Sequence, residues 1–186
     1  MIRLFDILFS LAGIILGLPV FIVVVILGLF DQGSPFFLQT RVGKNQKPFT
    51  LIKFRTMAIG TRSVGTHLVD PASITPIGHF LRRTKLDELP QLFNVLTGKM
   101  SMVGPRPCLP NQVELVDERA SREVFSIRPG ITGLAQIREV DMSTPRKLAR
   151  YDQVMLRRLD LWLYLRLIFA TASGKGRGDR VRPTAS

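Results

Sequence analysis

The clearest feature of the hydropathy pattern is an apolar run without charged residues, from Ile7 to Phe30. At a rise of ~1.5 Å per residue, a helix over this run would reach ~36 Å, which is enough for a bilayer core of ~30 Å. The run is too long for a cleaved signal peptide, and no Ala-x-Ala pattern follows it. The pattern therefore predicts a membrane-anchoring helix over residues 1–30.

Two arrangements of this helix remain open: a full span, and a re-entrant helix that enters and leaves the membrane on one face. Pro19 predicts a kink, because it removes a backbone hydrogen bond and clashes with the preceding turn, but prolines also occur in spanning helices. Arg3 and Asp6 are expected to pair at the headgroup level. Five cations follow the run: Arg41, Lys44, Lys47, Lys53 and Arg55. Under the positive-inside rule they place the globular part in the cytoplasm.

Residues 31–173 are expected to form one α+β domain that is mainly helical. Two strand-like runs, Phe36–Arg41 and Phe49–Met57, flank the turn residues Gly43–Pro48 and predict a small β-hairpin. The helices are expected over Ile77–Lys85, over Leu89–Leu96 with Pro90 in its first turn and Gly98 at its end, over 111–125, and over Leu148–Ala172. Residues 58–76 are expected to be a loop, and 174–186 a basic disordered tail.

The C-terminal helix interleaves Tyr151 and Trp162 with arginines, which suits an amphipathic helix lying at a membrane surface. A core helix with an exposed basic side explains the same pattern equally well. The sequence holds 26 basic and 14 acidic side chains, a formal charge of +12. This excess indicates an anionic partner: nucleic acid, acidic lipid headgroups or a phosphorylated substrate. Nucleic acid is disfavoured, because no nucleic-acid-binding motif is present.

The candidate chemistry centres on Asp87 and Glu88, which directly precede a predicted helix and follow Arg82, Arg83 and Lys85. The free N–H groups of a helix start favour anions. Two carboxylates among cations suit a diphosphate substrate with a bridging Mg²⁺, and a carboxylate can act as nucleophile beside a second one that acts as base. Capping of the helix by acidic residues is the simpler alternative.

Two other segments could bind a ligand. Gly104–Pro107 predicts a rigid turn that fixes Arg106 for phosphate binding. Pro129–Gln136 is punctuated by glycines, so its backbone could approach a ligand closely. Each alone could also be an ordinary surface turn. His67 and His79 lack metal-ligand spacing, and Cys108, the only cysteine, cannot form an intramolecular disulfide.

Taken together, the segments resemble one family, the small monotopic phosphoglycosyl transferases that start glycoconjugate assembly in bacteria. The matching stretches are Phe37–Gly43, Lys53–Met57, Leu86–Leu96, Met100–Pro107 and Arg128–Gln136. Leu-Asp-Glu-Leu-Pro-Gln followed by Gly-Pro-Arg-Pro is highly specific, and the resemblance covers nearly the whole chain, anchor included.

The resemblance implies transfer of a sugar-1-phosphate from a UDP-sugar to polyprenyl phosphate, usually undecaprenyl phosphate, with release of UMP. Asp87 would be the nucleophile that forms a covalent phosphosugar intermediate, Glu88 the base, and Mg²⁺ would bind beside Asp87. A hydrolase that splits nucleotide diphosphates with water is a competing function.

The resemblance also implies that Lys53, Arg82 and Arg106 face phosphates and that Gln136 lies near the nucleotide. The family's anchor is a re-entrant helix broken at a Ser-Pro pair, and its active site lies on the cytoplasmic face of the bacterial inner membrane, among anionic lipids. A homodimer is one arrangement that the resemblance allows.

The sequence departs from the family pattern at four places. Leu18 replaces the serine that often precedes the proline of the anchor. Arg138–Met142 stands where a Gly-Arg-Asn element is frequent, and Asp160 and Tyr164 stand where many relatives have Ser and Asp. These changes leave the carboxylate pair intact but leave the identity of the sugar open.

Overall fold

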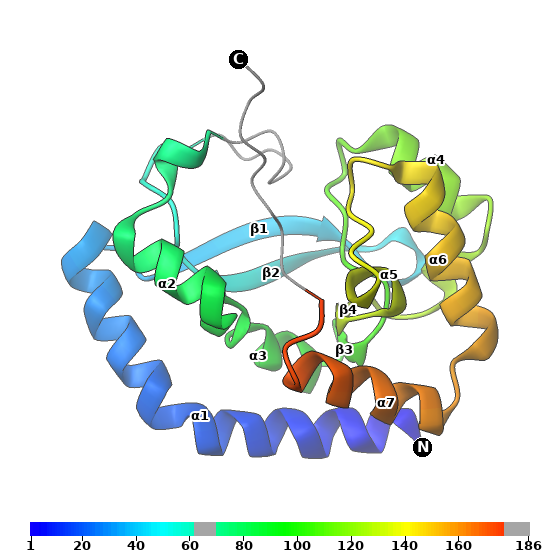
Figure 1. The fold of residues 1–186 in the computed structure, drawn as a ribbon, viewed down its shortest axis with the longest axis horizontal. Coiled ribbons are helices and arrows are strands. Elements are labelled where there is room, and N and C mark those ends of the chain that lie inside the picture. Colours follow the sequence, from blue (N-terminus) through cyan, green and yellow to red (C-terminus); the bar gives the residue numbers. More distant parts are fainter. Residues whose placement is uncertain (62–69, 177–186) are drawn as a thin grey trace.

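The computed structural model describes residues 1–61 and 70–176, and it is an α+β structure in which helices predominate (Figure 1). Its elements are α1 (Ile2–Gln32), β1 (Phe36–Val42), β2 (Pro48–Phe54), α2 (Pro76–Thr84), α3 (Gln91–Leu96), β3 (Ser101–Val103), α4 (Val113–Ala120), β4 (Gly130–Thr132), α5 (Leu134–Ile137), α6 (Pro145–Arg158) and α7 (Leu161–Ala172). His67 and most of the predicted disordered tail lie outside the described residues.

The apolar run forms α1, which is 31 residues long. Among the described residues it is the one helix long and apolar enough to cross a membrane. It bends about halfway along (Figure 1), and it contains Pro19, which cannot donate the hydrogen bond that a straight helix needs at that position. Gly33 ends the helix in a left-handed conformation, at φ 68°, and its N–H bonds the Leu29 carbonyl.

Both halves of α1 contact the same globular part. In the first half, a Cβ added to Gly13 would lie 2.9 Å from a methyl carbon of Leu92, so the helix lies close against α3. In the second half, the Phe21 ring lies 4.9 Å from that of Phe54 on β2, and 5.9 Å from that of Phe36 on β1. The bend thus keeps the helix against one domain along its length.

Asp6 fixes the N-terminal end of α1 to that domain. Its Oδ1 accepts hydrogen bonds from Ser101 Oγ and the Met102 N–H, both at 2.8 Å, and from the Tyr164 hydroxyl at 2.9 Å. The expected pair with Arg3 forms at 3.9 Å. Because Asp6 is almost fully buried, it acts mainly as a docking group for α1 rather than as a headgroup contact.

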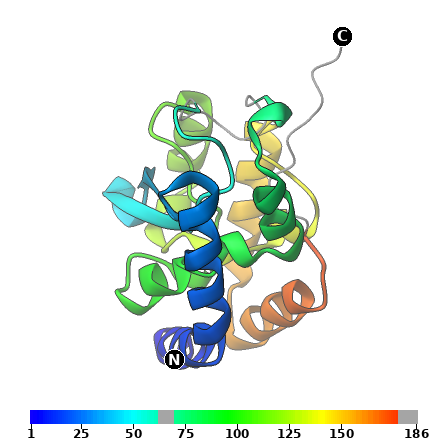
Figure 2. The same cartoon turned by 90° about the vertical axis from the view of Figure 1, so that its left-hand side faces the viewer.

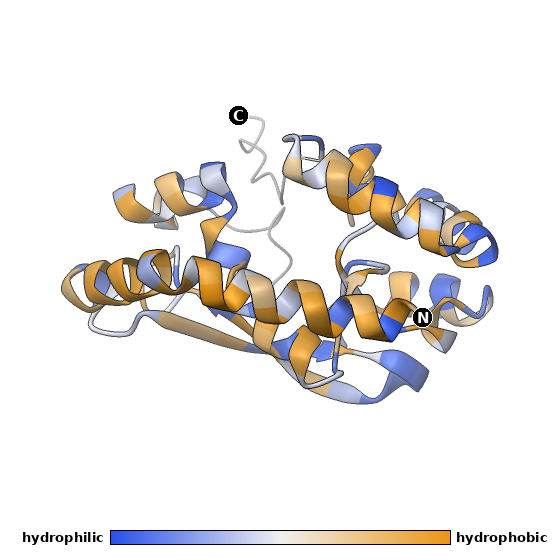
Figure 3. Cartoon of the chain, turned by 90° about the horizontal axis from the view of Figure 1, so that it is seen from below, coloured by the Kyte–Doolittle hydropathy of each residue, from blue (hydrophilic) through white to orange (hydrophobic). Residues whose placement is uncertain are grey.

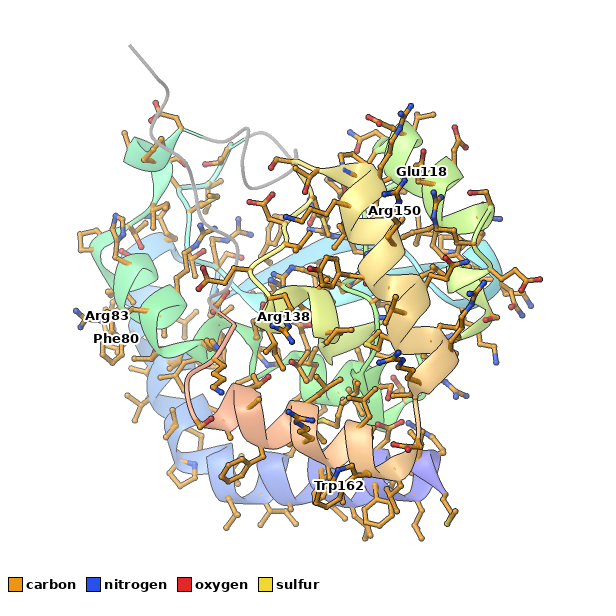
Figure 4. All side chains as sticks on the ribbon, turned by 45° about the vertical axis from the view of Figure 1, so that its right-hand side comes forward. Phe80, Arg83, Glu118, Arg138, Arg150 and Trp162 are labelled. Atoms are coloured by element: carbon orange, nitrogen blue, oxygen red, sulfur yellow. The ribbon has the colours of Figure 1, made fainter. Side chains whose placement is uncertain are left out.

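The side of α1 that faces away from the domain is an exposed apolar surface. Its exposed side chains include Leu4, Leu8, Leu11, Ile15, Leu16, Ile22, Val23, Ile26, Leu29 and Phe30. Viewed from this side, the ribbons of α1 and much of α7 carry hydrophobic colours (Figure 3). Trp162 and Phe169 on α7 are 75% and 76% exposed, and Trp162 projects outward beside α1 (Figure 4).

The predicted hairpin is confirmed. Strands β1 and β2 are antiparallel, with Phe36 opposite Phe54 and Val42 opposite Pro48. The hairpin and α7 lie on opposite sides of α1 (Figures 2 and 3). A second pair, β3 with β4, is parallel and was not predicted from the sequence. Buried side chains of β2, α3 and the β3 region form the core beneath the hairpin: Phe49, Leu51, Val95 and Met100.

Two predicted helices differ from the structure. The segment 111–125 forms α4 and a separate 3₁₀ turn at Val124–Ser126. The predicted helix Leu148–Ala172 is wrong as a single element, because it is divided into α6 and α7. Asp160 causes the division: its carboxylate accepts the Leu163 N–H at 2.7 Å and so begins a new helix.

Candidate functional site

Asp87 and Glu88 lie in a 3₁₀ turn, Leu86–Glu88, between α2 and α3. Lys85 ends α2 in the left-handed conformation, at φ 60°, which redirects the chain into this turn. The Glu88 N–H bonds the Lys85 carbonyl at 3.2 Å and the Leu89 N–H bonds the Leu86 carbonyl at 3.1 Å. These N–H groups are therefore engaged within the turn, and the electrostatics of the site come from side chains.

Glu88 is the point at which two cations meet. Its Oε1 lies 3.2 Å from Lys53 Nζ and 3.0 Å from Arg106 Nη2. All three side chains are mostly buried, with exposed fractions of 13% to 15%, so the pairing is screened less than it would be on an open surface. The structure thus brings together three residues that are far apart in the sequence.

Asp87 lies beside this cluster in a half-buried position. Burial raises the pKa of its carboxyl from 3.8 to about 6. The Lys53 charge opposes that rise, the Glu88 charge adds to it, and Arg82 and Arg106 oppose it. Asp87 is therefore largely ionised at neutral pH, yet poorly solvated for an aspartate, which favours reaction with an electrophile.

The side chain of Arg82 is oriented by the packing of α2 against the segment that follows β2. Its Nε donates to the Thr56 hydroxyl at 2.9 Å. Thr75 begins α2 by accepting the Gly78 N–H at 2.9 Å. A Cβ at Gly78 would lie 2.7 Å from the Thr56 carbonyl carbon, so glycine is needed for this close approach.

Glycines let the backbones of the two predicted turn segments, Gly104–Pro107 and Pro129–Gln136, pack closely against each other. A Cβ at Gly104 would lie 2.7 Å from the Gly130 nitrogen, and the Gly104 N–H bonds the Thr132 carbonyl at 2.8 Å. The segments that hold Arg106 and Gln136 are therefore pressed against each other. Close approach of a ligand to the glycines of Pro129–Gln136 stays a prediction; the structure shows that this segment packs closely against the backbone at Gly104.

Gln136 lies on α5, where its side-chain amide donates to the Ile131 carbonyl at 2.7 Å. This bond braces the segment that follows β4. The structure thus gives Gln136 a local structural contact, whereas Lys53, Arg106, Asp87 and Glu88 form one group.

The donor set limits how a metal ion could bind. Within residues 1–61 and 70–176, no group of three or more His, Cys, Asp and Glu side chains could hold one. Glu88 is occupied by two cations, so Asp87 is the carboxylate best placed to serve as ligand. Mg²⁺ commonly takes one or two carboxylates together with substrate phosphates. The site fits Mg²⁺ in that shared form.

Sequence reasoning missed a buried ion pair behind the site. Arg119 on α4 and Asp152 on α6 have side chains that are only 1% and 2% exposed, and they lie 2.7 Å apart. Arg119 also donates to the carbonyl of Arg106 at 2.8 Å. The only sequence signal was a charge on the apolar side of each helix.

The chain is similar in sequence to one family of known proteins over nearly its whole length. Residues 1–175 match the family model described as bacterial sugar transferase. The chain is 38% identical, over 91% of its length, to UDP-glucose:undecaprenyl-phosphate glucose-1-phosphate transferase of Klebsiella pneumoniae, of which the match covers 38%. It is 34% identical, again over 91% of its length, to UDP-galactose-lipid carrier transferase of Erwinia amylovora and to undecaprenyl-phosphate galactose phosphotransferase of Salmonella typhimurium, with 39% of each covered. The chain thus spans about two fifths of the length of these relatives. It belongs to the bacterial sugar transferase family.

Proposed function

We propose that this protein transfers a sugar-1-phosphate from a UDP-sugar to a polyprenyl phosphate, such as undecaprenyl phosphate, and releases UMP. The observation that carries the proposal is the environment of Asp87. Its half-buried carboxyl lies close to the charges of Lys53, Arg82 and Arg106, and its pKa is about 6. Relatives named as UDP-glucose or undecaprenyl-phosphate transferases support the two substrate classes. The product, a polyprenyl-diphospho-sugar, would begin the assembly of a membrane-linked glycan.

In the proposed mechanism, an Asp87 oxygen attacks the phosphorus that carries the sugar. The new bond joins that oxygen to phosphorus, and the bond to the UMP oxygen breaks, so UMP leaves with the electron pair. An oxygen of polyprenyl phosphate then attacks the same phosphorus and releases Asp87. The three cations stabilise charge on the phosphate oxygens throughout. Mg²⁺, bound by Asp87 and the diphosphate, would neutralise negative charge and favour the departure of UMP.

Glu88 has two roles in this proposal. As base it would accept the proton of the polyprenyl phosphate, but a phosphate monoester loses its second proton near pH 6, so little base strength is required at neutral pH. Its ion pairs with Lys53 and Arg106 indicate a second role, the positioning of both cations.

We further propose that α1 is re-entrant, anchoring residues 1–30, with the catalytic residues 31–173 on the cytoplasmic face of the inner membrane. The support is the bend in α1 and the contact of both its halves with one domain. The exposed Trp162 on α7 would lie in the same interface. Cysteine labelling near Ile2 should report a cytoplasmic N-terminus, and a periplasmic one would refute re-entry.

The direct test is a panel of UDP-sugars with undecaprenyl phosphate, in which UMP is measured. We expect UMP release that requires a UDP-sugar and is abolished by EDTA. A label on the sugar-linked phosphate should become attached to the wild-type protein but not to an Asp87→Asn variant. Full turnover by Asp87→Asn would refute covalent catalysis at this residue. UMP release that continues over many turnovers without added polyprenyl phosphate would favour the hydrolase, because the covalent mechanism releases only one UMP per enzyme before it needs the acceptor.

A further inference from the structure

The turn that presents Arg106 is held at four consecutive carbonyl oxygens, from Pro105 to Cys108. The donors are, in this order, Gly130 N, Arg119 Nη1, Arg41 Nη1 and Val42 N, at 3.0, 2.8, 3.0 and 3.0 Å. They come from β4, α4 and β1, so three separate elements converge on one short segment. Two of the four donors are arginine guanidinium groups rather than backbone amides.

Arg119 makes the most costly of these contacts. Its Nε and Nη2 donate to one oxygen of Asp152, at 2.9 and 2.7 Å, and the remaining Nη1 reaches the Arg106 carbonyl. Both charged side chains are almost fully buried between α4 and α6, which lie side by side (Figure 1). A planar guanidinium can bind a carboxylate with one edge and a carbonyl with another, whereas an ammonium group cannot span both.

Stability alone does not account for such a pair. Removing two charges from water is expensive, and replacing a buried ion pair with apolar side chains of similar volume is often neutral or stabilising. The specific result of this pair is a donor fixed opposite the Arg106 carbonyl. The Arg106 guanidinium in turn lies 3.0 Å from Glu88, beside the proposed nucleophile.

We propose that Arg119, oriented by Asp152, is a positioning residue: it holds the backbone of Arg106 so that the Arg106 guanidinium stays against Glu88 and the substrate phosphates. This inference rests on the proposed transferase function and extends it to α4 and α6. Arg119 is separated from substrate by Arg106, so it acts through that residue. Its loss should therefore lower the turnover number more than it weakens binding of the UDP-sugar.

The main test replaces the pair with Arg119→Met and Asp152→Leu in the full-length protein in nanodiscs, because this double variant removes both buried charges together. We expect a melting temperature close to that of the wild type and a kcat for UMP release lower by roughly tenfold to a hundredfold. A matched control is Arg122→Lys, since Arg122 lies just after α4 and pairs with Glu118 there. Wild-type kcat in the folded double variant would overturn the proposal.

A double-mutant cycle separates positioning from general destabilisation. In an Arg106→Ala background, loss of the Arg119 pair should cause little further decrease in kcat, because the guanidinium through which Arg119 acts is already absent. Two full and independent decreases would overturn the proposal. If the double variant does not fold, Arg119→Lys replaces it in the cycle, since lysine keeps the charge beside Asp152 but cannot also hold the Arg106 carbonyl.

The NMR signal of the Arg106 Nε–H gives a readout that does not depend on activity. The signal is assigned by its disappearance in Arg106→Lys. It should be sharp in the wild type and broadened in the double variant Arg119→Met, Asp152→Leu, or in Arg119→Lys if the double variant does not fold. An unchanged signal in that variant would refute the inference, whatever the substrate. Absence of UMP release by the wild type would refute the proposed function instead, so the two failures are distinguishable.

Discussion

Asp87 should reduce the stability of the ligand-free protein at neutral pH, so Asp87→Asn should stabilise it. Burial raises the pKa of this carboxyl from 3.8 to about 6, so the folded state binds its proton more tightly than the unfolded state does. The ionised form therefore costs stability. This cost is fully present above about pH 6, and it disappears as the pH falls toward 3.8.

The magnitude follows from the two pKa values. They differ by roughly two pH units, and at about 1.36 kcal/mol per unit the upper bound is ~3 kcal/mol. Because Asp87 is only half-buried and keeps part of its hydration, we expect about 1 to 3 kcal/mol. For a chain of this size, each kcal/mol changes the melting temperature by about 2 to 4 °C.

The assay is thermal unfolding in detergent with EDTA and without UDP-sugar, at pH 7.5 and at pH 4. Asp87→Asn should melt higher than the wild type at pH 7.5, and the difference should shrink toward zero at pH 4. Asp117→Asn is the matched control, since Asp117 is exposed on α4, and it should change neither value. An unchanged or lower melting temperature for Asp87→Asn at pH 7.5 would refute the reasoning that burial dominates at this carboxyl.

Further predictions concern activity. In a pH profile, kcat/KM should fall about tenfold per unit below about pH 6, as Asp87 becomes protonated, and a profile flat to pH 5 would contradict this. Glu88→Gln should lower kcat and also move the acidic limb to lower pH, because the Glu88 charge contributes to the raised pKa of Asp87; a limb that moves to higher pH would be the opposite result. Gly104→Ala should lower the melting temperature and nearly abolish UMP release, because its Cβ would meet the Gly130 nitrogen at 2.7 Å; wild-type values would show that the two segments can separate freely. Mg²⁺ with UDP should raise the melting temperature of the wild type more than that of Asp87→Asn, and equal increases would remove Asp87 from the metal site.

The elements that the sequence predicted are those whose signals are local. The long apolar helix α1, the hairpin Phe36–Phe54 and the short helices α2 and α3 each carry their own periodicity and their own turn residues. The parallel pair β3–β4 has strands of three residues, too short for a periodic signal, and its register depends on contacts between distant segments. The division at Asp160 was missed because the apolar pattern continues across it, while a capping carboxylate decides the helix boundary.

Part of the candidate site could be predicted from the sequence and part could not. The proximity of Lys53, Arg106 and the carboxylate pair was expected from the family pattern, and the structure brings them together. Spacing alone could not have done so, since Lys53 and Glu88 are 35 residues apart. Arg119 and Asp152 carry no such pattern. Their meeting depends on how α4 and α6 pack, which is a property of the whole fold.

The bonds of Asp6 have a consequence for the order of biosynthesis. Its partners Ser101, Met102 and Tyr164 follow it by 95, 96 and 158 residues, so a ribosome makes α1 well before any of them. Until these partners have been synthesised, the Asp6 carboxylate lacks its buried hydrogen-bond donors and must remain hydrated or protonated. The last of its hydrogen-bond donors, the Tyr164 hydroxyl, is synthesised only with α7. Helix α1 therefore reaches its final position against the domain only after α7 has been synthesised, and under the proposed membrane anchoring its insertion would precede the closure of the domain.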